Sequence, residues 1–314
     1  MLLVGRAGGL EERVVPAAGF QLETLRVRGL DRDAPWKNAL LPALLPAALA
    51  AALRVVDRFR PDVVLGVGGY VMAPALGAAG VRRLPYVLQV SESGGLANRM
   101  FRRGAAAACV TFPRDVEAFP TRRTVLTGYP LRRGFRRGTP RVPPEVLLVM
   151  GGSQGARRLN RAVWGALDGL LRRFREVVHL TGFQGEREAA GLRRPGYRPL
   201  PFSEEVPELM AGADLIVCRA GVGTCAELTA VGLPAVLVPG PFGGGHQERN
   251  AEELARAGAA VRVADSDLSP EVLLRVLDGL GEGRLRAMAR ASAGLGRPDA
   301  ARAIVRVLEE VALR

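Results

Sequence analysis

The segment LIVCRAGVGTCAELTAVGLPAVLV, residues 215–238, contains a complete strand–helix–strand pattern. The apolar run at 215–218 leads into two glycines, a helical pattern and a second apolar run at 235–238. Short runs that are apolar on both faces are typical of strands in a parallel sheet covered by helices. The glycines therefore mark the turn from a strand into the N-terminus of a helix.

The same alternation of short apolar runs and helical patterns recurs along the chain and predicts a doubly wound α/β fold. The stretch RRGFRRGTPRVPPE, residues 132–145, is basic, rich in Pro and Gly and without periodicity, so we interpret it as a linker. It separates two expected Rossmann-like domains, 1–135 and 142–296, with a closing helix at 297–314 that packs back on the first. The expected strands are 2–4, 63–67, 86–90, 107–111, 125–127, 146–150, 177–181, 215–218, 235–238 and 260–263.

The composition is that of a folded protein, with 48% hydrophobic residues and no low-complexity tract. The length, 314 residues, suits two domains of about 150 residues each. The formal net charge is +13, carried almost wholly by arginine because Lys37 is the only lysine. A positive surface favours nucleotides, lipid pyrophosphates and acidic bilayers. Nucleic acid is not an expected partner, because the few aromatic residues are not interleaved with arginine.

The cysteines and histidines argue against several kinds of site. Cys109, Cys218 and Cys225 are scattered without CxxC spacing, which predicts a reducing compartment, no disulfide framework and no zinc site. The two histidines, His179 and His246, are too few for a histidine-rich metal centre. The first residues, MLLVGRAGGLEERVV, lack the basic and apolar regions of a signal peptide.

The segment WKNALLPALLPAALAAAL, residues 36–53, carries no charge from residue 39 onward. This apolar stretch is shorter than the roughly 20 residues that a membrane-spanning helix needs, and Pro42 and Pro46 interrupt it. It fits either a buried helix of the first domain or an apolar patch at a membrane surface, flanked by basic residues.

Three glycine-rich loops follow predicted strands: GVGGYVMAP at 66–74, MGGSQGARRLN at 150–160 and RAGVGT at 219–224. Glycine lets a backbone approach phosphate closely, and the next helix contributes N–H groups and a favourable dipole. The same loops also occur as purely structural turns. None has the P-loop pattern, and none has the G-x-G-x-x-G fingerprint with an acid about 20 residues later.

Three polar residues near helix starts suggest sugar recognition. Glu227 lies one turn into its helix, where a carboxylate would repel a phosphate placed on it but can bond vicinal ribose hydroxyls. A surface glutamate that complements the helix dipole is the alternative. Gln247 and Asn250, in HQERNA, are spaced i, i+3 and share a helix face that suits sugar hydroxyls or an acetamide. A solvated helix start explains them equally well.

In this order, the motifs resemble those of the MurG family, glycosyltransferases that move N-acetylglucosamine (GlcNAc) from UDP-GlcNAc onto lipid I to make lipid II. The resemblance covers nearly the whole chain. It is carried by PDVVLGVGGYVMAP at 61–74, GYPLR at 128–132, GGSQGARRLN at 151–160, CRAGVGTCAEL at 218–228 and HQERNA at 246–251.

The resemblance implies a GT-B fold, in which two Rossmann-like domains face a cleft. The C-terminal domain would hold UDP-GlcNAc, and the N-terminal domain would take lipid I. The muramyl 4-hydroxyl would displace UDP with inversion, without a cofactor or an obligatory metal. The family's peripheral position on the cytoplasmic face of the cell membrane implies contact with the inner leaflet through residues 36–60.

Motif matches assign roles residue by residue. Glu227 would bind the ribose, and Arg132 would pair with a phosphate. The pyrophosphate would lie over 221–224 and Ser153, while Gln247 and Asn250 would face the GlcNAc or support that loop, and the segment at Phe202–Ser203 would flank uracil. The expected donor-binding residues are Arg132, Ser153, Gln154, Ser203, Gly221, Val222, Gly223, Thr224, Glu227, Gln247 and Asn250. The expected acceptor-side residues are Gly68, Gly69, Tyr70 and Asn98.

The sequence departs from the family pattern on the acceptor side. It starts at what resembles the family's second strand, so the first strand and a GGTGGH loop, with a histidine often assigned as the base, are expected to be missing. The family's HEQN segment becomes QVSESGGLAN at 89–98, and GNP becomes GYP at Tyr129. No catalytic base can be assigned, and Glu92 is the nearest candidate. The alternatives are a GT-B enzyme with another lipid acceptor, or a UDP-sugar-binding protein made inactive by the missing loop.

Overall fold

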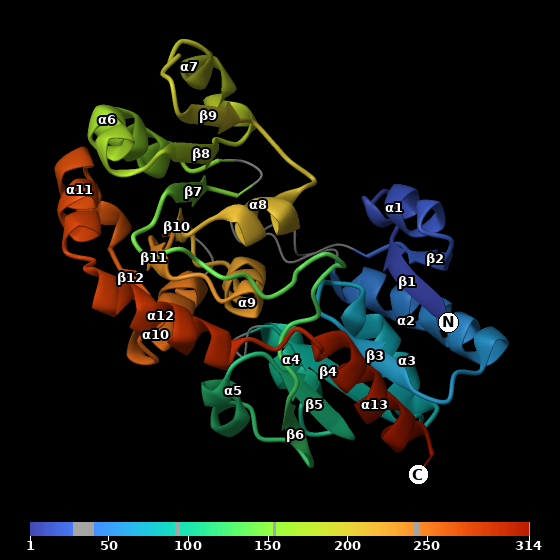
Figure 1. Ribbon diagram of the computed structural model, residues 1–314. Coiled ribbons are helices and arrows are strands. Elements are labelled where there is room, and N and C mark those ends of the chain that lie inside the picture. The colour runs from blue at the N-terminus through green and yellow to red at the C-terminus, as the bar shows by residue number, and fades with distance from the viewer. Residues whose placement is uncertain (28–40, 92–94, 153–154, 242–244, 314) are drawn as a thin grey trace. The chain divides into compact units, whose positions relative to one another are not determined.

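The computed structural model describes residues 1–27, 41–91, 95–152, 155–241 and 245–313. The chain divides into two compact units (Figure 1). The N-terminal unit comprises Met1–Thr127 and Arg302–Arg314, and the C-terminal unit comprises Gly128–Ala301.

The described strands of the N-terminal unit form two separate parallel sheets. One pairs β1 with β2, and the other has the order β3-β4-β5-β6. The strands are β1 (Leu2–Arg6), β2 (Gln21–Leu25), β3 (Val64–Gly66), β4 (Tyr86–Val90), β5 (Ala107–Val110) and β6 (Thr124–Leu126). The helices are α1 (Glu11–Ala17), α2 (Leu41–Phe59), α3 (Met72–Val81), α4 (Leu96–Phe101), α5 (Pro113–Ala118) and α13 (Ala300–Ala312), the last of which belongs to this unit from Arg302 onward.

Helices connect and cover the N-terminal sheets. Leu25 of β2, Ala52 of α2 and Ala78 of α3 form one buried apolar cluster. Leu49 of α2 approaches so closely that a Cβ on Gly77 of α3 would lie 3.2 Å from its Cδ1. The four-stranded sheet is covered on one face by α13, as the closing helix was expected to do (Figure 1).

The C-terminal unit has one parallel sheet of six strands in the order β12-β11-β10-β7-β8-β9. Residues of β7 are buried throughout, and α6 and α11 pack over it in a large apolar cluster. The strands are β7 (Val146–Met150), β8 (Glu176–Leu180), β9 (Tyr197–Leu200), β10 (Leu215–Cys218), β11 (Ala235–Leu237) and β12 (Ala260–Arg262). The helices are α6 (Arg157–Arg173), η2 (Phe183–Gly185), α7 (Glu186–Ala190), α8 (Val206–Gly212), α9 (Val222–Val231), α10 (His246–Arg256), η3 (Asp265–Asp267), α11 (Pro270–Asp278) and α12 (Glu282–Leu295).

The stretch expected to be a linker belongs to the C-terminal unit. The guanidinium of Arg137 donates to the carbonyl of Ala293 at 3.0 Å. Further along, the backbone N–H of Arg141 donates to the buried carboxylate of Asp214 at 2.8 Å. Because side chains anchor the stretch, the boundary lies after Thr127 rather than at the expected residue 135.

Candidate functional site

Most of the expected donor-binding residues follow strands of the C-terminal sheet. All six strands are parallel, so the loops after β7, β8, β9, β10 and β11 meet at the carboxyl edge of that sheet. This edge is the usual ligand-binding position in open α/β sheets.

The N-terminus of α9 lies at this edge directly after β10. Its N-cap, Gly221, is extended (φ −62°, ψ 146°) and offers no capping side chain, so the first-turn N–H groups remain available. A Cβ on Gly221 would meet nothing closer than Thr224 Oγ1, at 3.9 Å, and one on Gly223 would lie 3.8 Å from the Tyr129 ring. The helix begins at Val222, so this turn presents backbone donors to an anion.

Side chains fix the loops that follow β10 and β11. Asn250 is buried, and its amide donates to the carbonyl of Ala220 at 3.0 Å. Gln247 accepts from the N–H of Gly240 at 2.8 Å. Arg219 donates to the carbonyl of Val238 at 3.1 Å and pairs with Asp265. Asn250 therefore contacts the loop before α9, and its expected role toward GlcNAc stays a prediction.

Glu227 lies on the first turns of α9 and is partly buried. Burial raises the pKa of its carboxyl, and the positive charge of Arg132 opposes that rise. No other described residue gives this carboxylate a hydrogen bond or ion pair. A partly desolvated acceptor beside open N–H groups suits a ligand that carries both hydroxyl donors and an anion.

Arg132 connects this carboxylate with the segment after β9. Its guanidinium donates to the carbonyl of Glu204 at 3.2 Å and lies over the Phe135 ring at 5.8 Å. In the same segment, the Ser203 hydroxyl accepts from the N–H of Glu205 at 3.0 Å. A guanidinium near the α9 N-terminus also suits a phosphate.

The glycine-rich loop after β7 is tightly constrained. Gly155 has φ 80°, and a Cβ on it would clash with the carbonyl of Thr181. A Cβ on Gly151 would lie 2.7 Å from the backbone N of Ala156. Backbone space rather than chain flexibility therefore requires these glycines. Ser153 and Gln154 lie outside the described residues.

A buried hydrogen-bonded chain, which the sequence did not reveal, supports the ends of β8 and β9. The Asn160 amide donates to the carbonyl of Thr181 at 2.8 Å, so its oxygen accepts from His179 Nε2 at 3.1 Å. The Nδ1 of this histidine then accepts from the Tyr197 hydroxyl, at 3.0 Å. The Tyr197 oxygen accepts from Trp164 at 2.9 Å. Burial lowers the pKa of His179 to about 3, so the ring is neutral.

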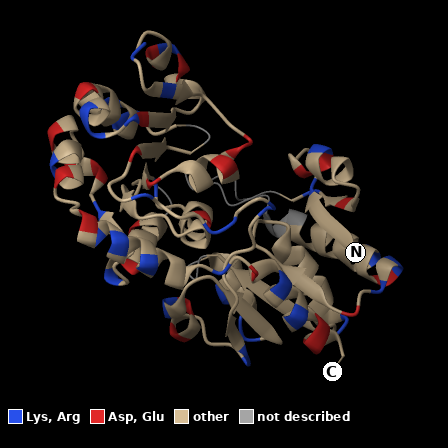
Figure 2. Ribbon diagram, viewed as in Figure 1, with Lys and Arg blue, Asp and Glu red and all other residues tan. Residues whose placement is uncertain are grey.

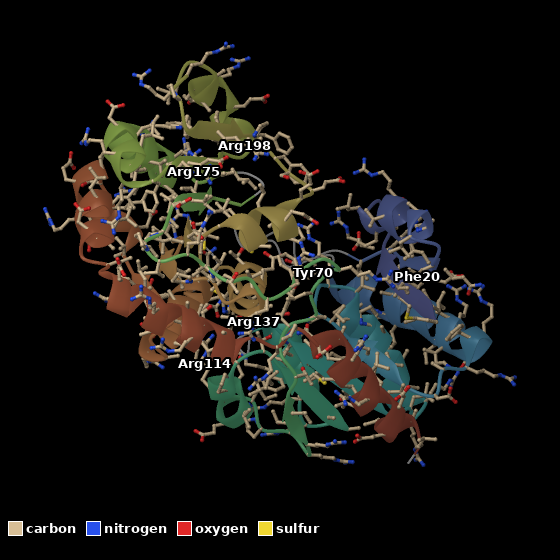
Figure 3. All side chains as sticks on the ribbon, in the orientation of Figure 1. Phe20, Tyr70, Arg114, Arg137, Arg175 and Arg198 are labelled. Atoms are coloured by element: carbon tan, nitrogen blue, oxygen red, sulfur yellow. The ribbon has the colours of Figure 1, made fainter. Side chains whose placement is uncertain are left out.

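The expected acceptor-side residues lie in the N-terminal unit. Gly68 and Gly69 have φ 102° and 76°, which permits the turn after β3. Tyr70 is 57% exposed (Figure 3), whereas Asn98 is buried on α4. The candidate base, Glu92, lies outside the described residues.

The described part of the apolar segment 36–53 has both buried and exposed residues. Residues 36–40 lie outside the described residues, and α2 begins at Leu41. Ala48 and Ala52 are buried in the N-terminal unit, whereas Leu45 is 54% exposed. No helix among the described residues is long and apolar enough to span a membrane. The segment thus contributes both to the core and to the surface.

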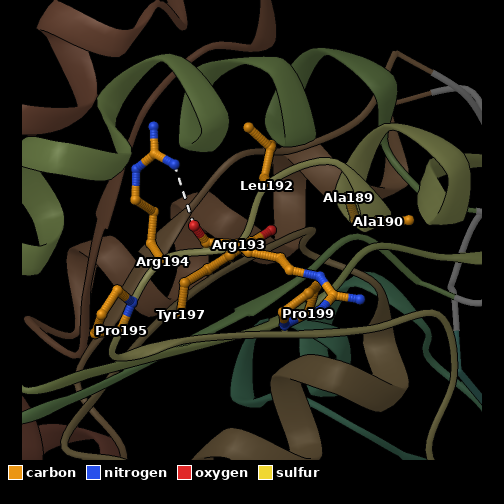
Figure 4. Close-up of a pocket in the computed structure, with 8 residues that line it drawn as sticks. All are labelled: Ala189, Ala190, Leu192, Arg193, Arg194, Pro195, Tyr197 and Pro199. Atoms are coloured by element: carbon orange, nitrogen blue, oxygen red, sulfur yellow. Dashed lines mark hydrogen bonds between the residues drawn. The ribbon is translucent and has the colours of Figure 1, made fainter.

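A pocket of about 470 Å³ lies between α7 and β9, away from the expected donor-binding residues (Figure 4). Its lining includes Arg193, Arg194 and Tyr197 but none of the expected site residues.

Within the described residues, no cluster of three or more His, Cys, Asp or Glu could hold a metal ion. Figure 2 shows basic and acidic residues interspersed along the helices of both units.

Known protein families and relatives match residues of both units. Models of the glycosyltransferase family 28 N-terminal and C-terminal domains match residues 3–109 and 146–304, respectively. A curated relative from Salinibacter ruber, named UDP-N-acetylglucosamine–N-acetylmuramyl-(pentapeptide) pyrophosphoryl-undecaprenol N-acetylglucosamine transferase, is 39% identical over 98% of this chain and 87% of its own length. A relative of the same name from Desulforudis audaxviator is 39% identical over 99% and 90%.

Solved structures show the same architecture. The crystal structure of Acinetobacter baumannii MurG matches with a TM-score of 0.80 at 27% identity, covering 98% of this chain and 90% of that one. The calicheamicin glycosyltransferase matches with a TM-score of 0.68 at 19% identity, covering 98% and 90%, and supports the fold alone.

Proposed function

The chain belongs to the MurG family within glycosyltransferase family 28, and we propose from this premise that it makes lipid II. It is a UDP-GlcNAc-dependent glycosyltransferase that transfers N-acetylglucosamine to the muramyl 4-hydroxyl of lipid I. The attacking hydroxyl gives its proton to a base and forms a bond to the anomeric carbon, while the bond from that carbon to UDP breaks with inversion.

The observation that carries the proposal is the environment of Glu227. The Glu227 carboxylate is partly buried on the first turns of a helix, and among the described residues it has no hydrogen bond or ion pair, only the more distant charge of Arg132. Such a carboxylate is costly unless a ligand pairs with it. The vicinal hydroxyls of a ribose supply two donors to one carboxylate. With the ribose there, the diphosphate extends toward the open N–H groups of Gly221–Thr224.

The same turn and Arg132 would stabilise the leaving group. Negative charge grows on the UDP oxygen as the glycosidic bond breaks. The uncapped N–H groups of α9 are preorganised donors for that charge, and the Arg132 guanidinium, whose charge acts on Glu227, would add to them. The proposed mechanism therefore needs no obligatory metal, and transfer should persist in the presence of a chelator.

The lipid acceptor requires access to a membrane. We propose that the chain binds the cytoplasmic leaflet peripherally, through residues 36–60. Leu45 and Phe59 are exposed on α2, and Arg54 and Arg60 supply positive charge for anionic headgroups, whereas Arg58 pairs with Glu23.

The test is a transfer assay with the purified full chain, UDP-GlcNAc and a lipid I analogue. The proposal predicts release of UDP and formation of lipid II. Transfer to another lipid but not to lipid I would favour the alternative acceptor that the altered segment 89–98 suggests. UDP-GlcNAc binding without transfer to any acceptor would leave a sugar-nucleotide-binding protein instead.

A further inference from the structure

An exposed aromatic pair lies at the carboxyl edge of the C-terminal sheet. Phe183 follows β8, Phe202 follows β9, and their ring centroids are 5.7 Å apart with planes 13° from parallel. The two residues are 58% and 49% exposed. Single exposed apolar residues are ordinary, but a stacked pair leaves a flat apolar surface in water. Such a surface suits a flat ligand group.

The backbone beneath Phe183 is held in place. Thr181 donates its N–H to the carbonyl of Leu200 at 2.9 Å, and the Asn160 amide donates to the carbonyl of Thr181 at 2.8 Å. Gly182 then adopts φ 73°, a conformation that favours glycine, and directs the chain into η2. The aromatic pair therefore stands on two strand ends that are hydrogen-bonded to each other.

Arg132 links this pair with Glu227. Its guanidinium donates to the carbonyl of Glu204, the second residue after Phe202, at 3.2 Å. The charge of the same guanidinium acts on the Glu227 carboxyl. A nucleotide whose ribose bonds to that carboxylate thus has the segment carrying Phe202 as a close neighbour.

We propose that Phe183 is a positioning residue for the base of the donor nucleotide and acts through Phe202. By stacking on Phe202, it holds that ring in the orientation in which the uracil of UDP packs. Without the stack, the Phe202 ring gains rotamer freedom that binding must remove again. This inference rests on the proposed function, because it requires UDP in the donor site.

Its test is calorimetric titration of the full chain with UDP. Phe183→Leu keeps an apolar side chain but removes the stack, and Phe183→Tyr keeps the stack. Phe202→Leu and the double variant complete a cycle that separates direct from indirect action. Phe20→Leu is the matched control, an exposed phenylalanine of the N-terminal unit (Figure 3).

Phe183→Leu should weaken UDP binding about two- to tenfold, Phe183→Tyr should restore it, and the double variant should bind no worse than Phe202→Leu. Unchanged affinity in Phe183→Leu, or losses that add in the double variant, would overturn the inference. Loss of vesicle association with unchanged UDP affinity would assign the pair to lipid and overturn it too. If the unmodified chain bound no UDP, the proposed function itself would fail.

Discussion

The two units use the same kind of strand but complete their sheets differently. In the C-terminal unit six parallel strands form one sheet, and every residue of β7 is buried between β10 and β8. In the N-terminal unit the described strands form a pair and a group of four, and most of β1 is only partly buried. Neither β1 nor β3 has a described strand on its second side.

This difference between the sheets coincides with the proposed division between donor binding and acceptor binding. Side-chain hydrogen bonds hold the loops at the edge of the continuous sheet, as the contacts of Asn250 and Arg219 show. The donor half of the proposed reaction therefore rests on a rigid frame. The acceptor half rests on the unit whose sheet is divided, and the departures from the family's motifs fall there too.

The largest change in the free energy of unfolding is expected from Asp214, whose carboxylate anchors the start of the C-terminal sheet. Asp214 is 3% exposed and accepts from the backbone N–H groups of Arg141, Glu145 and Val146. Asp214→Ala leaves these donors without an acceptor, and we expect a loss of about 3–5 kcal/mol in the free energy of unfolding. Chemical denaturation followed by hydrogen exchange should place that loss in the C-terminal unit.

Asp168→Ala is the control for this substitution. Its carboxylate is 76% exposed and pairs with Arg194 at 3.6 Å on the surface, so the expected change is below about 0.5 kcal/mol. Equal losses in the two variants would contradict the anchoring role of Asp214, and so would a loss that hydrogen exchange places in the N-terminal unit.

The next largest change in stability is expected from the buried hydrogen-bonded side chains at the ends of β8 and β9. The pKa of His179 is about 3 in the folded chain and about 6.5 when exposed, so the unfolded chain binds more protons between these values. The contribution of His179 to stability should be constant above pH 6.5 and fall on acidification, by about 3 kcal/mol at pH 4. Thermal unfolding across pH measures this loss. His179→Gln should remove that part of the slope, whereas His246→Gln should keep it.

The smallest change in stability is expected on the N-terminal unit. Leu45→Ser replaces a half-exposed side chain and should alter the free energy of unfolding by less than about 0.5 kcal/mol. It should nevertheless reduce co-sedimentation with anionic vesicles, while UDP affinity is unchanged. Leu49→Ser is the variant to compare with it. Leu49 packs against the core, so this substitution should lower the free energy of unfolding as well. Equal sedimentation of Leu45→Ser and the unmodified chain would argue against a membrane role for this position.

Much of the fold could be predicted because parallel strands are apolar on both faces. The expected strands are present, including the run at 215–218 that forms β10. The two missed strands are β2, QLETL, and β9, YRPL. Both lie at a sheet edge and carry polar or proline residues, so they lack the continuous apolar run on which the prediction depended.

The site was predictable where a motif includes its own backbone geometry. The glycines around Glu227 indicated both the turn and the open helix N-terminus. By contrast, Phe183 and His179 belong to no local pattern, because their partners, Phe202 and Tyr197, come from the neighbouring strand. The burial of Asn250 was equally invisible, since the spacing of Gln247 and Asn250 indicates a shared helix face but not what covers it.

The central claim is that the C-terminal unit binds UDP through Glu227, and the most direct test is the dissociation constant of UDP for Glu227→Gln. The variant removes the charged acceptor for the ribose, so we expect binding to weaken by about 1.5–3 kcal/mol. Burial raises the pKa of this carboxyl, so the charged form destabilises the folded chain at pH 7. Without ligand, Glu227→Gln should therefore be slightly more stable than the unmodified chain at pH 7. This difference should disappear on acidification, when the carboxyl is protonated. Glu204→Gln, whose contact with Arg132 is through the backbone, should bind UDP normally. An unchanged dissociation constant for Glu227→Gln would contradict the account.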